Sequence, residues 1–190
     1  MNVINSQMLQ SKKMVTDNNI HVFQTGPTTY GLSIGNLFFQ CAVGKNGIGN
    51  KQREGDGITP IGDFPIRFGF YRSDRVKSSP ITVEGVCMME SNKTIGWCDD
   101  PSDPIHYNRL VALPFPYSSE QIWREDDLYN VVLVLGYNDD PVVVGRGSAI
   151  FMHVAKEGYG PTAGCVSLKL QDLLKVLSMV TCDTIVSIRP

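Results

Sequence analysis

The sequence lacks long apolar segments and clusters of basic residues, and each absence excludes a class of protein. The longest apolar runs, such as residues 131–135, are far shorter than the roughly 18 residues that a membrane-spanning helix needs. No run of lysine and arginine is available to neutralise a row of phosphates, and the formal net charge is -2. We therefore expect neither a membrane span nor nucleic-acid binding.

Cysteine motifs and a secretion signal are also missing. The 5 cysteines are widely spaced and contain no CxxC pair, which argues against a disulfide framework and against a structural zinc site. The aspartates at 99, 100 and 103 do not have the spacing of a calcium-binding loop. We expect no metal and no other cofactor. The first twenty residues are polar, so export would need a signal outside this chain or another route, and a cytoplasmic location stays an alternative.

What is present is typical of one globular domain. Hydrophobic residues make up 42% and charged residues 19% of the 190 residues, enough to bury a core. Residues 1–18 show little periodicity and are expected to form a flexible arm, followed by a single domain over residues 19–190. We expect a monomer.

Glycine, proline and asparagine separate short β-rich runs, which favours a mainly antiparallel β architecture. Strands are predicted over residues 37–43, 64–71, 131–137, 141–144, 149–154 and 184–188. The runs 131–137 and 141–144 flank an Asn-Asp-Asp sequence and predict a hairpin. Leucines spaced at i, i+3, i+4 and i+7 predict a helix over residues 170–177, and residues 118–129 predict a short one.

The strongest chemical signal lies in residues 145–168, GRGSAIFMHVAKEGYGPTAGCVSL. His153 ends a predicted strand, and Cys165 follows 12 residues later, a separation that a returning loop would close. A cysteine needs such a partner because the thiolate is the nucleophile, and histidine titrates near the working pH. Gly164 allows backbone amides to point into open space as an oxyanion hole, with the amides of Gly164, Cys165 and Ala163 as candidate donors. Two buried bystanders are the alternative interpretation of the pair.

Four ordered motifs resemble the L,D-transpeptidase (YkuD-type) catalytic domain. They are EGDGITPIGDFPI at 54–66, GWCDDPSDPIHYN at 96–108, GRGSAIFMHV at 145–154 and TAGCV at 162–166. The resemblance covers roughly residues 20–190. It implies a β-rich sandwich or barrel-like fold with one C-terminal α-helix and minor helices. It also implies acyl transfer on peptidoglycan stem peptides in the cell envelope, with Cys165 as nucleophile and His153 as general base and acid.

Several activities fit that scaffold. An acyl-enzyme at Cys165 would pass to an amine of a second stem peptide or of an envelope protein. Alternatively, water would resolve it, as in an L,D-carboxypeptidase or a peptidoglycan–protein amidase. The chain could also be a catalytically silent wall-binding module, or an effector that acts outside its own envelope. The family often has histidine and arginine or asparagine where this chain has Ala163 and Ser167, so acceptor choice is open.

Further residues are candidates for lining the substrate cleft. Aromatic and amide groups give a pocket shape and hydrogen-bond selectivity, and an arginine can pair with a substrate carboxylate. The predicted substrate-binding residues are Trp97, Tyr107, Asn108, Arg146, Ser148, Thr162 and Ala163. The imidazole nitrogen of His153 that does not face Cys165 is expected to meet a carbonyl or hydroxyl near Gly147 or Ser148. For Trp97 to Asn108, a structural loop held by Asx turns is the alternative.

Overall fold

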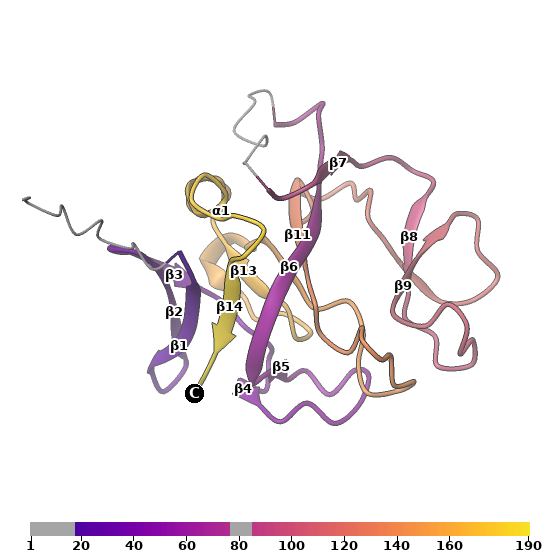
Figure 1. The fold of residues 1–190 in the computed structure, drawn as a ribbon, viewed down its shortest axis with the longest axis horizontal. Helices are drawn as coiled ribbons and strands as arrows, with labels where there is room; N and C mark the ends of the chain where they lie inside the picture. The colour runs from indigo at the N-terminus through magenta and orange to yellow at the C-terminus, as the bar shows by residue number, and fades with distance from the viewer. Residues whose placement is uncertain (1–17, 77–84) are drawn as a thin grey trace, which may run out of the picture.

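Most strands of the protein form one large curved sheet. The computed structural model describes residues 18–76 and 85–190. The main sheet runs in the order β13 (Val166–Leu168), β12 (Phe151–Val154), β11 (Val131–Leu135), β6 (Gly62–Tyr71), β14 (Ile185–Ile188), β1 (Ile20–Gly26), β2 (Thr29–Ile34) and β3 (Leu37–Cys41), with β7 (Met88–Glu90) beside β6. Figure 1 shows β6 as the long central strand.

Smaller elements lie around this sheet. A second sheet has the order β10 (Ser119–Gln121), β8 (Ile95–Cys98) and β9 (Arg109–Ala112), and β4 (Ile48–Gly49) pairs with β5 (Thr59–Pro60). The helices are α1 (Leu170–Leu177) and the 3-10 turn η1 (Glu157–Tyr159). In Figure 1, β8 and β9 lie on the opposite side of β6 from α1.

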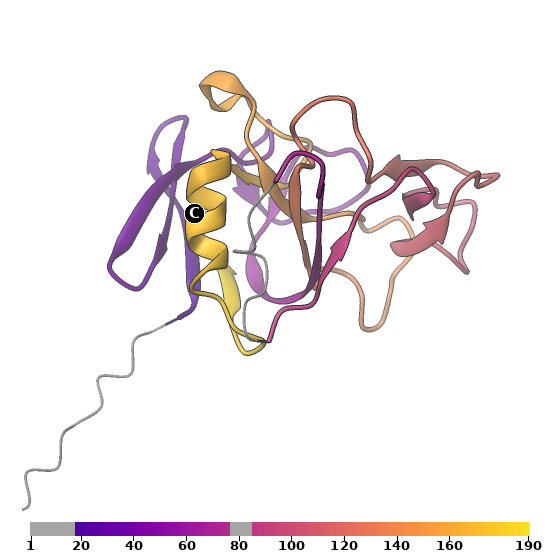
Figure 2. The ribbon, with the colours of Figure 1, turned by 90° about the horizontal axis from the view of Figure 1, so that it is seen from above.

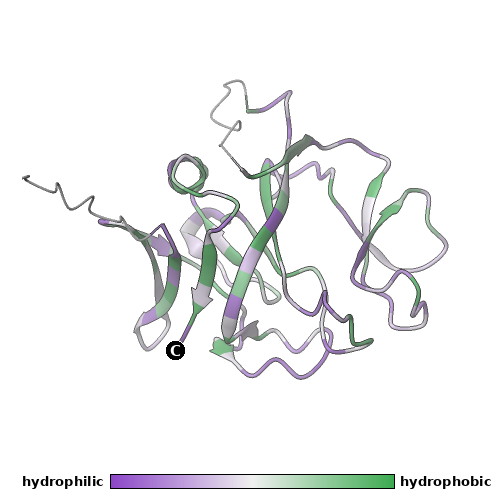
Figure 3. Cartoon of the chain, in the orientation of Figure 1, coloured by the Kyte–Doolittle hydropathy of each residue, from purple (hydrophilic) through white to green (hydrophobic). Residues whose placement is uncertain are grey.

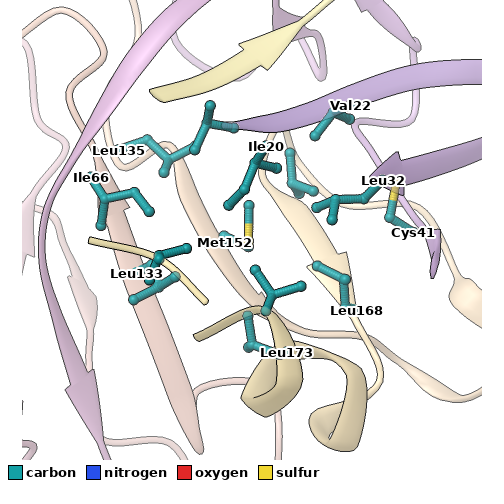
Figure 4. Close-up of a cluster of buried hydrophobic side chains, with 14 of the residues drawn as sticks. Ile20, Val22, Leu32, Cys41, Ile66, Leu133, Leu135, Met152, Leu168 and Leu173 are labelled. Atoms are coloured by element: carbon teal, nitrogen blue, oxygen red, sulfur yellow. The ribbon is translucent and has the colours of Figure 1, made fainter. Parts of the chain in front are cut away.

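The main sheet nearly closes on itself. Ala42, just after β3, and Ser167 on β13 exchange two backbone hydrogen bonds of 2.9 Å, so the two ends of the strand order meet. The curved sheet encloses a core of apolar side chains from both halves of the chain (Figure 4). Helix α1 contributes Leu173, Val176 and Leu177 to this core. Figure 2 shows the helix between the N-terminal strands and the rest of the main sheet.

A second buried cluster covers the other face of the main sheet. It joins Val132 and Val134 of β11 and Phe151 of β12 to Trp97 of β8. Because side chains alternate along a strand, β11 sends successive valines and leucines to two different cores, which explains why it is apolar throughout (Figure 3). The site described below lies in this second cluster.

The mainly β fold with one C-terminal helix is confirmed, as are the helix 170–177 and all predicted strands except 141–144. The predicted hairpin is wrong: β11 pairs with β6 and β12, and residues 141–144 form a turn in which Asn138 bonds the Val143 backbone. The helix predicted over 118–129 is also wrong, because β10 pairs with β8 there. The arm predicted over 1–18 lies, except for its last residue, outside the described residues.

Among residues 18–76 and 85–190, no helix has the length and apolar character that a bilayer span requires.

Candidate active site

Neighbouring strands bring His153 and Cys165 to one face of the main sheet. Strands β12 and β13 are parallel, with His153 opposite Ser167. Side chains alternate along each strand, so His153, Cys165 and Ser167 face the second cluster, while Met152 and Val166 face the main core. The loop from 155 to 165 returns the chain to the strand it left. The two predicted catalytic residues therefore do not point to opposite faces.

Cys165 forms a wall shared by two cavities. One, of about 210 Å³, is bordered by His153, Cys165 and Ser167, and we call it the His153 cavity. The other, of about 150 Å³, is bordered by Lys51, Glu54 and Cys165, and we call it the Lys51 cavity. A reactant in either cavity would reach the sulfur, and the imidazole lines the first cavity only.

The imidazole of His153 is held by the main chain. Its Nδ1 lies 2.8 Å from the carbonyl oxygen of Val154. Because a carbonyl oxygen can only accept a hydrogen bond, Nδ1 carries the proton. This leaves Nε2 with a lone pair, as a general base requires. The ring also packs edge-on against Tyr129, with centroids 5.3 Å apart. The expected carbonyl partner is present, but its predicted position near Gly147 or Ser148 is wrong.

The thiol of Cys165 is bonded to the strand beside it. Sγ donates to the carbonyl oxygen of Ala149 at 3.2 Å and accepts from the amide of Phe151 at 3.4 Å. Ala149 has a φ of 50°, a left-handed conformation that is uncommon for a residue with a side chain. This backbone turn brings its carbonyl to the thiol.

Burial favours the neutral forms of both Cys165 and His153. Loss of hydration raises the pKa of Cys165 to about 12, although the Phe151 amide acts in the opposite direction. Loss of hydration also lowers the pKa of His153 to about 4, against the effect of the Val154 carbonyl. Both shifts penalise the charged form. The sequence pattern suggested a thiolate beside a histidine that titrates near the working pH, whereas these pKa shifts favour a neutral thiol and a neutral imidazole at pH 7.

Over residues 15–188 the sequence matches the YkuD family, described as the L,D-transpeptidase catalytic domain. The chain belongs to this family. Among solved structures, it is similar to an L,D-transpeptidase from Mycobacterium smegmatis, with 14% identity, a TM-score of 0.40 and 90% of this chain aligned. The alignment spans 59% of that structure's chain. No curated protein sequence matches significantly. Membership therefore rests on the family match, which agrees with the resemblance seen in the motifs.

In this YkuD domain, the side chains of two threonines hold the loop before Cys165. The Gly164 amide donates to Thr162 Oγ1 at 3.1 Å, and that hydroxyl donates to the Cys165 carbonyl at 2.7 Å. Thr59 Oγ1 donates to the Gly164 carbonyl at 2.8 Å. Gly164 has a φ of 147°, and a side chain there would press on the Ile58 carbonyl. The Gly164 amide, predicted as an oxyanion donor, is therefore already occupied by Thr162.

Three residues expected to line the cleft are buried instead. Trp97, Tyr107 and Asn108 are 7%, 0% and 5% exposed, and none borders either cavity. Asn108 Oδ1 accepts from Trp97 Nε1 at 2.9 Å and from the Ala149 amide at 3.1 Å. Tyr107 donates to Glu54 and accepts from the Gly147 amide. These contacts support the structural alternative, in which the residues hold the backbone at the site.

The remaining predicted binding residues are divided between the two cavities and the surface. Thr162 borders the His153 cavity, Ser148 borders the Lys51 cavity, and Ala163 borders both. Ser148 Oγ donates to Glu54 at 2.7 Å. Arg146 is exposed, its guanidinium donates to Gln52 Oε1 at 3.4 Å, and it borders neither cavity. Three of these four residues thus border a cavity that Cys165 also borders.

Sequence reasoning missed several residues that border the cavities, chiefly Lys51, Glu54, Glu120 and Tyr129. Glu54 stands inside the EGDGITP motif and Lys51 precedes it, so the motif itself was the available signal. Glu120 and Tyr129 come from a segment predicted as a helix, and only the pairing of β10 with β8 brings Glu120 to the site. Among the residues that the structure describes, no three or more His, Cys, Asp or Glu residues are grouped as metal ligands.

Proposed function

We propose that the protein transfers acyl groups of peptidoglycan stem peptides through a thioester on Cys165, with His153 as general base and acid. The observation that carries this proposal is that both residues leave neighbouring strands on one face and border one cavity. The fixed tautomer of His153 adds support because it leaves Nε2 free to accept a proton.

In the first half-reaction, the thiol proton passes from Sγ to Nε2 of His153 as Sγ attacks the carbonyl carbon of the third stem-peptide residue. The C=O π pair moves to oxygen, giving a tetrahedral oxyanion that the Cys165 amide stabilises. The intermediate then collapses, the C–N bond breaks, and the proton on His153 goes to the departing terminal D-amino acid. A thioester remains on Cys165.

In the second half-reaction, the amine of an acceptor gives a proton to Nε2 of His153 and attacks the thioester carbonyl. The C–S bond breaks, and the sulfur recovers its proton from His153. The acceptor is a second stem peptide or an amine-bearing envelope protein. We place this reaction in the cell envelope, where its substrate occurs.

The proposal is tested by incubating the purified protein with a disaccharide-tetrapeptide and measuring the intact mass. The expected adduct on Cys165 is the tripeptide acyl group, formed with release of one terminal amino acid. Cys165→Ala should show no adduct, and the matched control Cys182→Ala, which removes an exposed cysteine, should behave like wild type. An adduct on Cys182 or Cys41 would refute the assignment of the nucleophile.

Hydrolysis is the second candidate outcome, and the small side chains beside the nucleophile favour it. Ala163 and Ser167 both border the His153 cavity, and the buried Ser167 hydroxyl has no hydrogen-bond partner among the described residues. A cavity of about 210 Å³ that is bordered by a hydroxyl with an unused hydrogen-bonding capacity can hold a water. We therefore expect tripeptide as well as cross-linked dimer at low acceptor concentration, measured by mass spectrometry. Dimer alone, with no detectable tripeptide, would show that the site excludes water.

A further inference from the structure

The oxyanion of the proposed intermediate needs more than the Cys165 amide. Oxyanion holes place donors about 2.7–3.1 Å from the developing charge. The Gly164 amide is already bonded to Thr162 Oγ1 at 3.1 Å. With the Gly164 amide occupied, the amide of Cys165 is the one donor at the sulfur-bearing residue itself, and a side chain that reaches the same place can act beside the loop amides.

Lys51 supplies a buried cation at this place. Its side chain is only 2% exposed, and it borders the Lys51 cavity together with Gly164 and Cys165. Lys51 Nζ lies 3.5 Å from the point that a Cβ on Gly164 would occupy. Lysine is almost never fully buried without a partner, and here Asp56 lies 2.7 Å from Nζ. An ammonium has three donors, so pairing with Asp56 leaves two for another group.

Residues from two distant segments of the chain hold Lys51 in position. Asp56 accepts from the amides of Gln52 and Ile58 at 2.8 and 3.0 Å, which folds the segment around the ion pair. Burial opposes ionisation of Asp56, but the Lys51 ammonium and these amides outweigh it and lower its pKa to about 2. Gly147, with a φ of 103°, leaves the space through which the Lys51 stem passes. The ammonium is thus fixed before any substrate arrives.

We propose that Lys51 Nζ is the second oxyanion donor, contacting the substrate carbonyl oxygen as the thioester at Cys165 forms and breaks. This inference rests on the proposed function. The Lys51 side chain is only 2% exposed, and a buried, preorganised ammonium stabilises a developing negative charge more than it would in water. Because an oxyanion forms in both half-reactions and only in their intermediates and flanking transition states, the effect falls on the rates of acylation and deacylation, of which acylation is measured below.

A purely structural role for Lys51, as the counter-charge of Asp56, predicts a different result. Lys51→Met alone would leave a buried carboxylate unpaired and destabilise the fold. The double variant Lys51→Met/Asp56→Asn removes both charges together. The matched control is Arg67→Met/Asp139→Asn, which removes another 2.7 Å ion pair that borders neither cavity.

The experiment compares two reactions of Cys165 in each variant. Acylation by the disaccharide-tetrapeptide passes through an oxyanion, whereas alkylation by iodoacetamide does not. For Lys51→Met/Asp56→Asn we expect acylation to slow by about 10²–10³-fold, and the acylation-to-alkylation rate ratio to fall by at least about 10-fold. The control variant should keep the wild-type ratio. Thermal unfolding of each variant establishes that it is folded.

An unchanged ratio in the folded double variant would overturn the role of Lys51. If that variant does not fold, Lys51→Leu/Asp56→Leu, which replaces the ion pair with apolar side chains and leaves no donor at position 51, gives the same comparison. Failure of wild type to form any adduct with the tetrapeptide would refute the proposed function itself, so the two failures are distinguishable.

Discussion

The two faces of strands β12 and β13 are equally buried but chemically unlike. On one face, Met152 and Leu168 are 0% exposed and pack into the main core. On the other, His153 and Cys165 are 6% and 9% exposed and border a cavity. Alternation along a strand lets successive residues serve stability and chemistry separately. Burial alone therefore does not identify a core position, because a buried polar face can be the reactive one.

The largest expected effect is the loss of turnover when the Cys165 thiol is removed, compared with the loss of stability when a core residue on the opposite face is removed. Cys165→Ala should reduce turnover by at least about 10⁴-fold, since the covalent route is lost, while the free energy of unfolding changes little. Leu168→Ala, on the opposite face, should lower the free energy of unfolding by about 2–5 kcal/mol and keep the turnover of the folded fraction. Steady-state kinetics and urea unfolding of both variants measure this. Residual turnover in Cys165→Ala would contradict the separation.

The next effect is the pH dependence of the free energy of unfolding. Burial lowers the pKa of His153 to about 4, so as pH falls from about 6.5 the unfolded chain takes up a proton that the folded protein does not. The resulting decrease in the free energy of unfolding is nearly complete at pH 4. At 1.36 kcal/mol per pKa unit, it amounts to about 3 kcal/mol. The difference in unfolding free energy between wild type and His153→Gln should change by this amount between pH 7 and pH 4.

The apolar face provides the control for that pH series. Leu168 carries no ionisable group, so the destabilisation by Leu168→Ala should be nearly the same at both pH values. A pH dependence of wild type that persists unchanged in His153→Gln would show that other groups, not His153, cause it.

A smaller effect is expected for the side-chain amide of Asn108, which holds the backbone beside Cys165. Asn108→Ala removes the acceptor shared by Trp97 Nε1 and the Ala149 amide. We expect a loss of about 1–3 kcal/mol in unfolding free energy, because buried donors lose their partner. We also expect a lower kcat with little change in KM, because the Ala149 carbonyl that bonds Cys165 shifts. An unchanged kcat in the folded variant would mean that the Ala149 carbonyl keeps its position without the Asn108 side chain.

The smallest effect is expected at Ser167, whose buried hydroxyl has no partner among the described residues. Ser167→Ala should leave the free energy of unfolding within about 0.5 kcal/mol of wild type, because no hydrogen bond to the protein is lost. If the hydroxyl contacts substrate or water, the ratio of tripeptide to dimer should change a few-fold. Equal ratios in both proteins would assign Ser167 to packing alone.

Local patterns in the sequence predicted the strands and α1 well, because alternation and helical spacing depend on neighbouring residues. They failed where contacts between residues far apart in the sequence determine the local structure. Residues 118–129 have helix-like composition, but pairing of β10 with β8 sets their structure. The motif reasoning selected His153 and Cys165, whose placement on one face depends on strand register. It did not anticipate their pKa shifts, which depend on burial by Tyr129 and other residues far along the chain.

Closure of the sheet has a consequence for aggregation and for local opening. Without the bonds between Ala42 and Ser167, β13 would be an edge strand, with backbone groups available to other chains. With them, the strand that follows Cys165 is paired on both sides, and its fraying requires the contact with the end of β3 to open as well. In hydrogen exchange, the amides of Ala42 and Ser167 should therefore open together, which would link the stability of the loop around Cys165 to that of the N-terminal strands.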